Sequence, residues 1–298
     1  MIYTLDLKFL DKPDTIAAFL IKTSAGPILV ETGPYSTFGA LRQAVEEKGY
    51  QMEDIRHVFI THIHLDHAGA AWALAELGAA IYLHPFGRQH MHDPSKLLAS
   101  ATRIYGEDGM ARLWSTLKPI PSEKLKTVEH QEVITIGDVD VKAWHTPGHA
   151  VHHIAWQVGG ELFSGDVAGV KIEGGPVMPP CPPPDINIEH WQSSINLLRS
   201  LGLNKIHLTH FGAIPAGRIK AHLDELEAGL LRWAAWMRPH YEQGRKAEDI
   251  TPLFQEFVKQ ELSAAGVTGE KYELYENANP AWMSVAGLLR YWKKKLTE

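Results

Sequence analysis

The chain has 298 residues, of which 45% are hydrophobic and 21% are charged, and its formal net charge is −6. This composition is typical of a globular protein with a sizeable core. The acidic balance argues against nucleic acid as a partner, because a negative surface repels phosphate backbones. One cysteine excludes an intrachain disulfide, no apolar run is long enough to cross a membrane, and the first residues lack a signal-peptide pattern. We therefore expect a cytoplasmic protein that binds neither nucleic acid nor a membrane.

Up to about residue 210 the chain alternates short apolar runs with helical patterns. The patterns predict strands at 15–23, 27–31, 55–60 and 80–83, helices at 38–47 and 69–77, and a helical insertion over 86–125. They then predict strands at 133–136, 139–144, 153–158 and 161–164, a helix at 188–201 and a strand at 205–208. Six prolines between residues 174 and 185 predict an irregular segment.

After His210 the pattern becomes wholly helical. One apolar face recurs at intervals of four and three residues through Ile219, Leu223, Leu226, Leu230, Trp233 and Met237. Pro239 is expected to end this helix, a second should open at Thr251-Pro252 and a third at Asn279-Pro280. We divide the chain into a catalytic domain, 1–212, and a C-terminal helical extension, 213–298. The extension caps the pocket, pairs two chains as a homodimer, or only packs on the core.

The motif Thr61-His62-Ile63-His64-Leu65-Asp66-His67 follows the apolar strand at 55–60. In an extended chain, residues two apart face the same side, so His62 and His64 can hold one ion. A turn into a helix at about Asp66 would direct Asp66 and His67 towards a neighbouring position. Four candidate ligands within six residues predict a metal site.

Three later residues have the same placement, each after a predicted strand. His149 follows a Pro-Gly turn, Asp166 follows Gly165, and His210 follows the strand at 205–208. Each signal is weak alone, because an aspartate after glycine or a lone histidine usually lies on the surface. Together the seven residues place nitrogen and oxygen ligands at one edge of the sheets, which suits a divalent ion.

This ordered set resembles the metallo-β-lactamase superfamily over about residues 15–212. The matching motifs are His62-x-His64-x-Asp66-His67, Thr146-Pro147-Gly148-His149, Phe163-Ser164-Gly165-Asp166 and Thr209-His210. The resemblance implies that His62, His64 and His149 bind a first metal, that Asp66, His67 and His210 bind a second, and that Asp166 bridges them. It also implies an α/β fold, a four-layer αββα sandwich with the metals at one edge. The family's Asp-Thr-Gly is Glu31-Thr32-Gly33 here, which keeps a carboxylate outside the ligand set.

Two adjacent divalent ions, zinc or alternatively iron or manganese, would lower the pKa of a shared water to roughly 7 and polarise a substrate carbonyl. This predicts a binuclear metal-dependent hydrolase in which a metal-bridging hydroxide cleaves an ester, thioester or lactone bond of a small metabolite. Asp66 is the candidate catalytic residue, because it could orient the nucleophile or carry a proton to the leaving group. The alternative is that Asp66 is only a metal ligand.

The branch of the superfamily is less defined by sequence. Hydrolases of the glyoxalase II type share the first motif but tend to have a basic C-terminus, and Lys293-Lys294-Lys295 is better explained as favourable charge at a helix end. Lactonases often carry a tyrosine three residues after the bridging aspartate, where this chain has Gly169. An iron-dependent oxidoreductase similar to sulfur dioxygenases is the main alternative, and β-lactam hydrolysis a lesser one. A degenerate binding module is disfavoured by the complete ligand set.

Other residues have weaker assignments. Tyr105, Trp114, Met178 and Phe211 either border the metals or belong to the core. One of His145, His152 and His153 is expected to support a metal ligand. His84, His90 and His92 could line the pocket, and His57, His130, His190, His207, His222 and His240 are interpreted as surface or packed residues. Cys181, among prolines and without a basic neighbour, is interpreted as structural.

Overall fold

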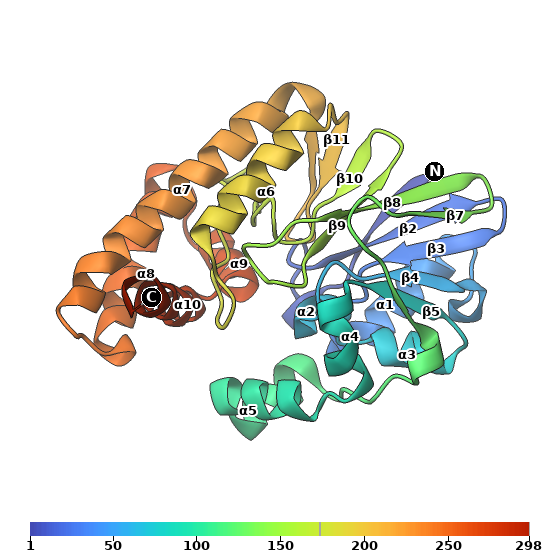
Figure 1. The fold of residues 1–298 in the computed structure, drawn as a ribbon, viewed down its shortest axis with the longest axis horizontal. Coiled ribbons are helices and arrows are strands. Elements are labelled where there is room, and N and C mark those ends of the chain that lie inside the picture. Colours follow the sequence, from blue (N-terminus) through green and yellow to red (C-terminus); the bar gives the residue numbers. More distant parts are fainter. Residues whose placement is uncertain (173, 298) are drawn as a thin grey trace.

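The computed structural model describes residues 1–172 and 174–297. Within them the chain forms two six-stranded sheets, flanked by helices on both outer faces (Figure 1). The first sheet has the order β1-β2-β3-β4-β5-β6. Its strands are β1 (Ile2–Asp6), β2 (Ala17–Thr23), β3 (Gly26–Val30), β4 (His57–Phe59), β5 (Ala80–Leu83) and β6 (Leu125–Thr127). Strands β3 to β6 run parallel, so their carboxyl ends meet at one edge.

The second sheet has the order β12-β11-β10-β9-β8-β7. Its strands are β7 (Val133–Ile136), β8 (Val139–His145), β9 (Ile154–Val158), β10 (Glu161–Phe163), β11 (Lys205–His207) and β12 (Ala213–Pro215). Strands β10 and β11 are parallel, while the other neighbours are antiparallel. The turns after β10 and β11 therefore leave the second sheet at the same edge.

Alternation along the strands explains the layers. In β2, Phe19 and Ile21 enter a core between the two sheets, whereas Ala18 and Leu20 face the helices outside the first sheet. In β10, Phe163 faces the other sheet and Leu162 faces outward. Because both faces of each sheet carry apolar side chains, each sheet needs a covering layer of helices.

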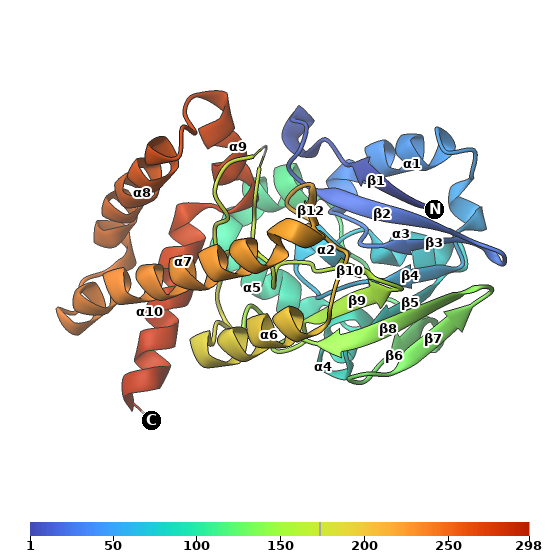
Figure 2. The same ribbon diagram turned by 90° about the horizontal axis from the view of Figure 1, so that it is seen from above.

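Helices α1 (Phe38–Glu46), α2 (Leu65–Ala68), α3 (Ala71–Glu76), α4 (Pro85–His92) and α5 (Ser95–Gly109) belong to the side of the first sheet. Helices α6 (Ile188–Ser200), α7 (Ala216–Glu242), α8 (Ala247–Ala264), α9 (Glu270–Ala278) and α10 (Ala281–Thr297) share one core with the second sheet. Figures 1 and 2 show α8 and α10 at the end of the molecule opposite the N-terminus. The αββα sandwich and its C-terminal helices are thus as expected. No helix in the described ranges is long and apolar enough to cross a membrane.

Several predicted boundaries were wrong. Helix α7 continues through Pro239 to Glu242, because a proline one turn before the end removes only one late backbone hydrogen bond. The second C-terminal helix begins at Ala247 rather than at Thr251-Pro252, with Glu248 and Asp249 in its first turn, where acidic side chains are stabilising. The hydroxyl of Thr251 donates to the carbonyl of Ala247 inside that helix instead of capping it.

Other elements were missed. Strands β1 and β6 are sheet edges, and β12 interrupts the segment after His210 that was expected to be wholly helical. Between residues 213 and 297 the chain has four helices rather than three, since α9 precedes α10. The division of the chain after residue 212 stays a prediction, with β12 lying just beyond it and adding to the second sheet.

Candidate metal centre

All seven predicted ligands come together at the edge where β4, β10 and β11 end. Three groups place their ligand atoms within 4.8 Å of one another: His62, His64 and His149; His62, His67 and Asp166; and Asp66, His67 and His210. The chain turns into α2 at Leu65, so it does change direction immediately before Asp66. We call His62, His64 and His149 the first group, and Asp66, His67 and His210 the second. The two groups are adjacent, because the rings of His62 and His67 lie 4.0 Å apart between centroids.

The first group is built from two loops. His62 Nε2 lies 2.9 Å from His64 Nδ1, and His149 Nε2 lies 3.0 Å from the same His64 nitrogen. The loop between β8 and β9 brings His149 to the loop after β4, and both His62 and His149 are almost fully buried. Three imidazole nitrogens therefore converge on one point.

The second group lies beside the first. His67 Nε2 and His210 Nε2 are 3.3 Å apart. Asp66 Oδ2 is 3.7 Å from His67 Nε2 and 3.5 Å from His210 Nε2. The side chain of Asp66 is 23% exposed, whereas those of both histidines are at most 1% exposed. Asp66 is therefore the member of this group that solvent or substrate can reach.

Asp166 lies between the two groups. Its Oδ2 is 3.4 Å from His149 Nε2, and its Oδ1 is 3.3 Å from His67 Nε2 and 3.4 Å from His210 Nε2. Oδ1 is buried and has no hydrogen-bond partner among the described residues. One carboxylate thus presents one oxygen to each group, which is the arrangement that a bridging ligand requires.

The orientation of the rings fits a metal. His67, His149 and His210 each use the outer nitrogen, Nδ1, to donate to a protein oxygen, which directs the lone pair of Nε2 into the site. Nitrogens bound to one tetrahedral zinc lie about 3.3 Å apart, given Zn–N bonds of about 2.0–2.1 Å. The observed separations are close to that value, and lone pairs pointed at one another repel unless a cation lies between them.

The pKa values of the histidines shift in opposite directions in the two groups. Burial lowers the pKa of His64 to about 3 and also lowers the pKa of His62 and His149. Burial acts in the same direction on His67 and His210, but the charges of the neighbouring carboxylates outweigh it and raise both pKa values. The first group is therefore kept as neutral imidazoles, which is the form that binds metals.

Glu31, at the end of β3, supports both groups from behind. Its Oε1 accepts from His67 Nδ1 at 3.0 Å, and its carboxylate also accepts from Thr61 and Thr209. The hydroxyl of Thr61 in turn lies 3.0 Å from His62 Nδ1. The carboxylate remains outside the ligand set, as expected, but one buried charge orients a histidine of each group.

A further histidine and two backbone carbonyl groups also hold the candidate ligands in place. His153 was one of three candidates for this role; its Nε2 accepts from the backbone N–H of Asp166 at 3.2 Å and its Nδ1 lies 2.8 Å from Thr146 Oγ1. Pro180 O accepts from His149 Nδ1 at 2.9 Å, and Thr15 O accepts from His210 Nδ1 at 2.8 Å. Sequence reasoning missed both carbonyls, because a backbone acceptor has no residue-type signature.

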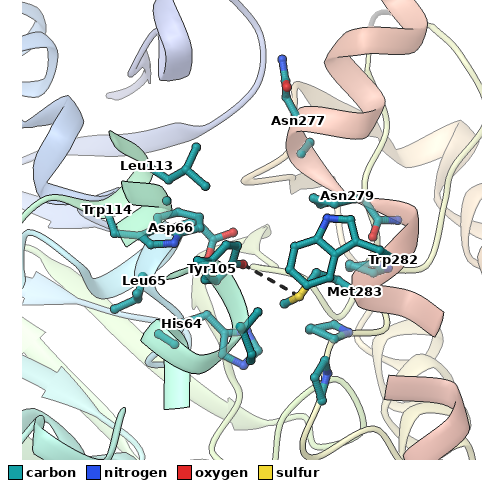
Figure 3. Close-up of a pocket in the computed structure, with 18 of the residues that line it drawn as sticks. His64, Leu65, Asp66, Tyr105, Leu113, Trp114, Asn277, Asn279, Trp282 and Met283 are labelled. Atoms are coloured by element: carbon teal, nitrogen blue, oxygen red, sulfur yellow. Dashed lines mark hydrogen bonds between the residues drawn. The ribbon is translucent and has the colours of Figure 1, made fainter. Parts of the chain in front are cut away.

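A pocket of about 480 Å³ opens onto the site. His64, Asp66, His149 and Asp166 lie in its wall. Its apolar walls come from α5 and the following π-helical turn (Met110–Trp114) on one side and from α10 on the other (Figure 3). Tyr105 and Trp114 lie on the first side, and Trp282 and Met283 on the second. The C-terminal helices therefore help to enclose the candidate site as well as packing on the core.

Several of the weaker assignments can now be placed. Of the two alternatives for these residues, Tyr105 and Trp114 border the pocket, whereas Met178 is buried in the core of the second sheet and Phe211 packs against that core. His84 stacks on His145 at 4.1 Å between ring centroids instead of lining the pocket. Cys181 is fully buried and burial raises its pKa, so it is not poised as a nucleophile.

The same residues identify the family. A family model described as the Metallo-beta-lactamase superfamily matches residues 11–210, well over half of the chain. The chain belongs to the metallo-beta-lactamase superfamily. The match ends at His210, so it spans all seven residues of the candidate metal centre, and the C-terminal helices lie beyond it.

Two relatives were found by sequence. A metallo-beta-lactamase fold-containing protein of Sulfurisphaera tokodaii is 27% identical over 180 residues, which is 59% of this chain and 67% of the relative. A hydroxyacylglutathione hydrolase of Tolumonas auensis is 29% identical over 150 residues, 50% of this chain and 45% of the relative. This chain therefore aligns with less than half of the hydrolase.

Solved structures share the superfamily fold. A metallo-beta-lactamase family protein of Thermus thermophilus has a TM-score of 0.68 and 20% identity, covering 99% of this chain and 93% of that one. A B3 metallo-beta-lactamase with an active-site glutamic acid has a TM-score of 0.57 and 16% identity, covering 78% and 86%. At these identities the likeness shows the fold alone. Coverage of 99% by the Thermus protein shows that the likeness extends into the C-terminal helices.

Proposed function

We propose that this superfamily member is a binuclear metal-dependent hydrolase, with zinc as the first candidate metal. His62, His64 and His149 would hold one ion, and Asp66, His67 and His210 the other. The observation that carries the proposal is Asp166, whose two oxygens face the histidines of both groups at 3.3–3.4 Å. A structural single-metal site has no use for such a carboxylate.

Two ions bound there would lower the pKa of a water to roughly 7 and polarise a carbonyl oxygen. The chain's own residues supply the rest. Asp66, which lines the pocket and is partly exposed, is placed to orient the nucleophile or to carry a proton to the leaving group. Glu31 and Pro180 fix the rings of His67 and His149, so that the site is organised before substrate binds.

The pocket supports the proposed class of substrate. Its walls are mainly apolar, and the chain has a net charge of −6, so a small, partly apolar ester, thioester or lactone suits it better than a polyanion. The similarity to a hydroxyacylglutathione hydrolase supports the thioester within this set. The reaction belongs to acyl transfer to water.

The test is a substrate panel of esters, thioesters and lactones on protein stripped and reloaded with Zn²⁺. We expect turnover of at least one class, its loss with a chelator, and a fall of at least about 100-fold for Asp66→Asn. His190→Gln, at an exposed position, is the matched control and should behave as the unmodified protein. Zinc-loaded protein without any turnover, together with oxygen consumption by iron-loaded protein, would favour the sulfur dioxygenase-like alternative.

A further inference from the structure

Tyr105 projects into the pocket from α5, on the side opposite the C-terminal helices (Figure 3). Its ring is held edge-on by two tryptophans, Trp114 at 5.2 Å and Trp282 at 5.5 Å between ring centroids. The two tryptophans come from the insertion and from α10, which are far apart in the sequence. These contacts fix the direction of the phenol and leave its hydroxyl at the centre of the apolar walls.

The hydroxyl of Tyr105 has a poor partner. It donates to Met283 Sδ at 3.9 Å and makes no other hydrogen bond with the residues that the structure describes. A thioether sulfur is a weak acceptor, so most of this donor's capacity is unused. The side chain is half-buried in the pocket wall, and a ligand that supplies an oxygen acceptor would give this donor a stronger partner than the thioether.

The hydroxyl also keeps its proton. Burial and the nearby negative charge of Asp66 both raise the pKa of Tyr105. The group is therefore a neutral donor at physiological pH. Asp66 lines the same pocket, which places the donor on the path that leads to the candidate metal centre.

We propose that Tyr105 positions the substrate: its hydroxyl exchanges the thioether of Met283 for an oxygen acceptor on the acyl group. The pocket then selects acyl groups that are otherwise apolar but carry one such oxygen beyond the scissile carbonyl. This inference rests on the proposed hydrolase function and deepens it by naming a substrate class. An analogue without the oxygen leaves the donor with only the weak thioether acceptor, so it should be a poorer substrate.

The experiment compares two near-isosteric probes, S-phenyl hexanethioate and S-phenyl 5-oxohexanethioate, with 3-oxo and 4-oxo analogues to sample the position of the oxygen. Released thiophenol is measured with zinc-loaded protein. We expect kcat/KM to be about fivefold to tenfold higher for the best oxo thioester than for the hexanethioate. In Tyr105→Phe the ratio should fall to nearly one, because the ring keeps its apolar contacts but no longer offers a donor.

Tyr275→Phe is the matched control, because Tyr275 is a buried tyrosine whose hydroxyl is already paired with backbone groups of Ile172 and Pro176. It should lose stability and keep the oxo preference. Equal kcat/KM for all thioesters in the unmodified protein, or a Tyr105→Phe variant that loses both probes equally, would overturn the proposal.

Binding separates this proposal from the proposed function. The free acids hexanoate and 5-oxohexanoate are titrated against zinc-loaded protein by tryptophan fluorescence, with the 3-oxo and 4-oxo acids again included. A preference for an oxo acid that disappears in Tyr105→Phe supports the role of Tyr105 even if no thioester is hydrolysed, in which case the hydrolase proposal alone fails. Equal affinities of both proteins for all the acids would refute the role of Tyr105 whatever the turnover.

Discussion

Gly287 allows α10 to approach the proline-rich segment that holds His149. A Cβ atom at this position would lie 2.8 Å from the carbonyl carbon of Pro182 and closer still to the carbonyl oxygen of Cys181, inside the 3.0 Å that real Cβ atoms respect. Both neighbours are backbone, so no flexible side chain can move aside. In Gly287→Ala, α10 must therefore shift as a unit, and Trp282 and Met283 move with it.

The magnitude follows from two opposing effects. Replacing glycine by alanine inside a helix ordinarily stabilises by about 1 kcal/mol. Forcing an extra carbon into a packed contact costs about 1–3 kcal/mol, and a backbone clash belongs to the upper end. We expect a net loss of about 2 kcal/mol, which lowers the Tm by about 3 °C for a chain of this size.

The assay is thermal unfolding of zinc-loaded protein, with hydrolysis of the best substrate measured in parallel. Gly217→Ala, near the start of α7 and with nothing within 4 Å of its added Cβ, is the matched control and should leave Tm unchanged or slightly higher. Gly287→Ala should also raise KM, because the pocket wall moves. A Gly287→Ala variant as stable as Gly217→Ala would refute the reasoning about this contact.

Three further predictions follow from the site and its surroundings. Asp66→Ala should lower kcat by at least about 100-fold without lowering Tm by more than a few degrees, since the side chain is partly exposed at a sheet edge; near-normal turnover would show that Asp66 is not the proton-handling group. Glu31→Gln should weaken metal binding about 10–100-fold in a chelator competition, because an amide cannot accept from every donor that faces this carboxylate; unchanged affinity would contradict its orienting role. Burial lowers the pKa of His222 to about 4, so below pH 6.5 the unfolded chain takes up a proton that the folded chain refuses. His222 should therefore contribute a loss of stability on the order of 3 kcal/mol between about pH 6.5 and 4, and His222→Gln, compared with His190→Gln in urea titrations across this range, should make the fall smaller by that amount.

Most strands and helices could be predicted, because alternation and helical periodicity are visible within a few neighbouring residues. The strand at 80–83 and the strand at 133–136 have the bounds that alternation predicts. Pro239 and Pro252 misled the helix predictions, since tertiary packing of α7 and α8 on one shared core outweighs the loss of single hydrogen bonds. Strand β12 was missed because three residues are too few to show a period.

The candidate metal ligands could be predicted because histidine and aspartate side chains are recognisable in the sequence by their type and spacing. His62, His64, Asp66 and His67 are adjacent in sequence, and the three later ligands each follow a strand. The supports of these residues were not predictable. They include the carbonyl groups of Pro180 and Thr15, whose positions depend on how distant segments fold together.

The walls of the pocket were not predictable either, because they also depend on contacts between distant segments. Tyr105 and Trp282 meet at 5.5 Å between ring centroids although they belong to separate helical segments, α5 and α10. Periodicity shows that each segment is amphipathic but does not show which segment its apolar residues will contact. The sequence therefore left open whether the C-terminal helices reach the pocket, and the paths of the two segments in space decide it.

The most direct test of the account is anomalous X-ray scattering at the zinc edge from crystals of the zinc-loaded protein. We predict two peaks about 3.5–4 Å apart, one among His62, His64 and His149 and the other among Asp66, His67 and His210, with Asp166 contacting both. A single peak, with His67 and His210 beyond ligand distance from it at full zinc loading, would contradict the binuclear centre and the mechanism built on it.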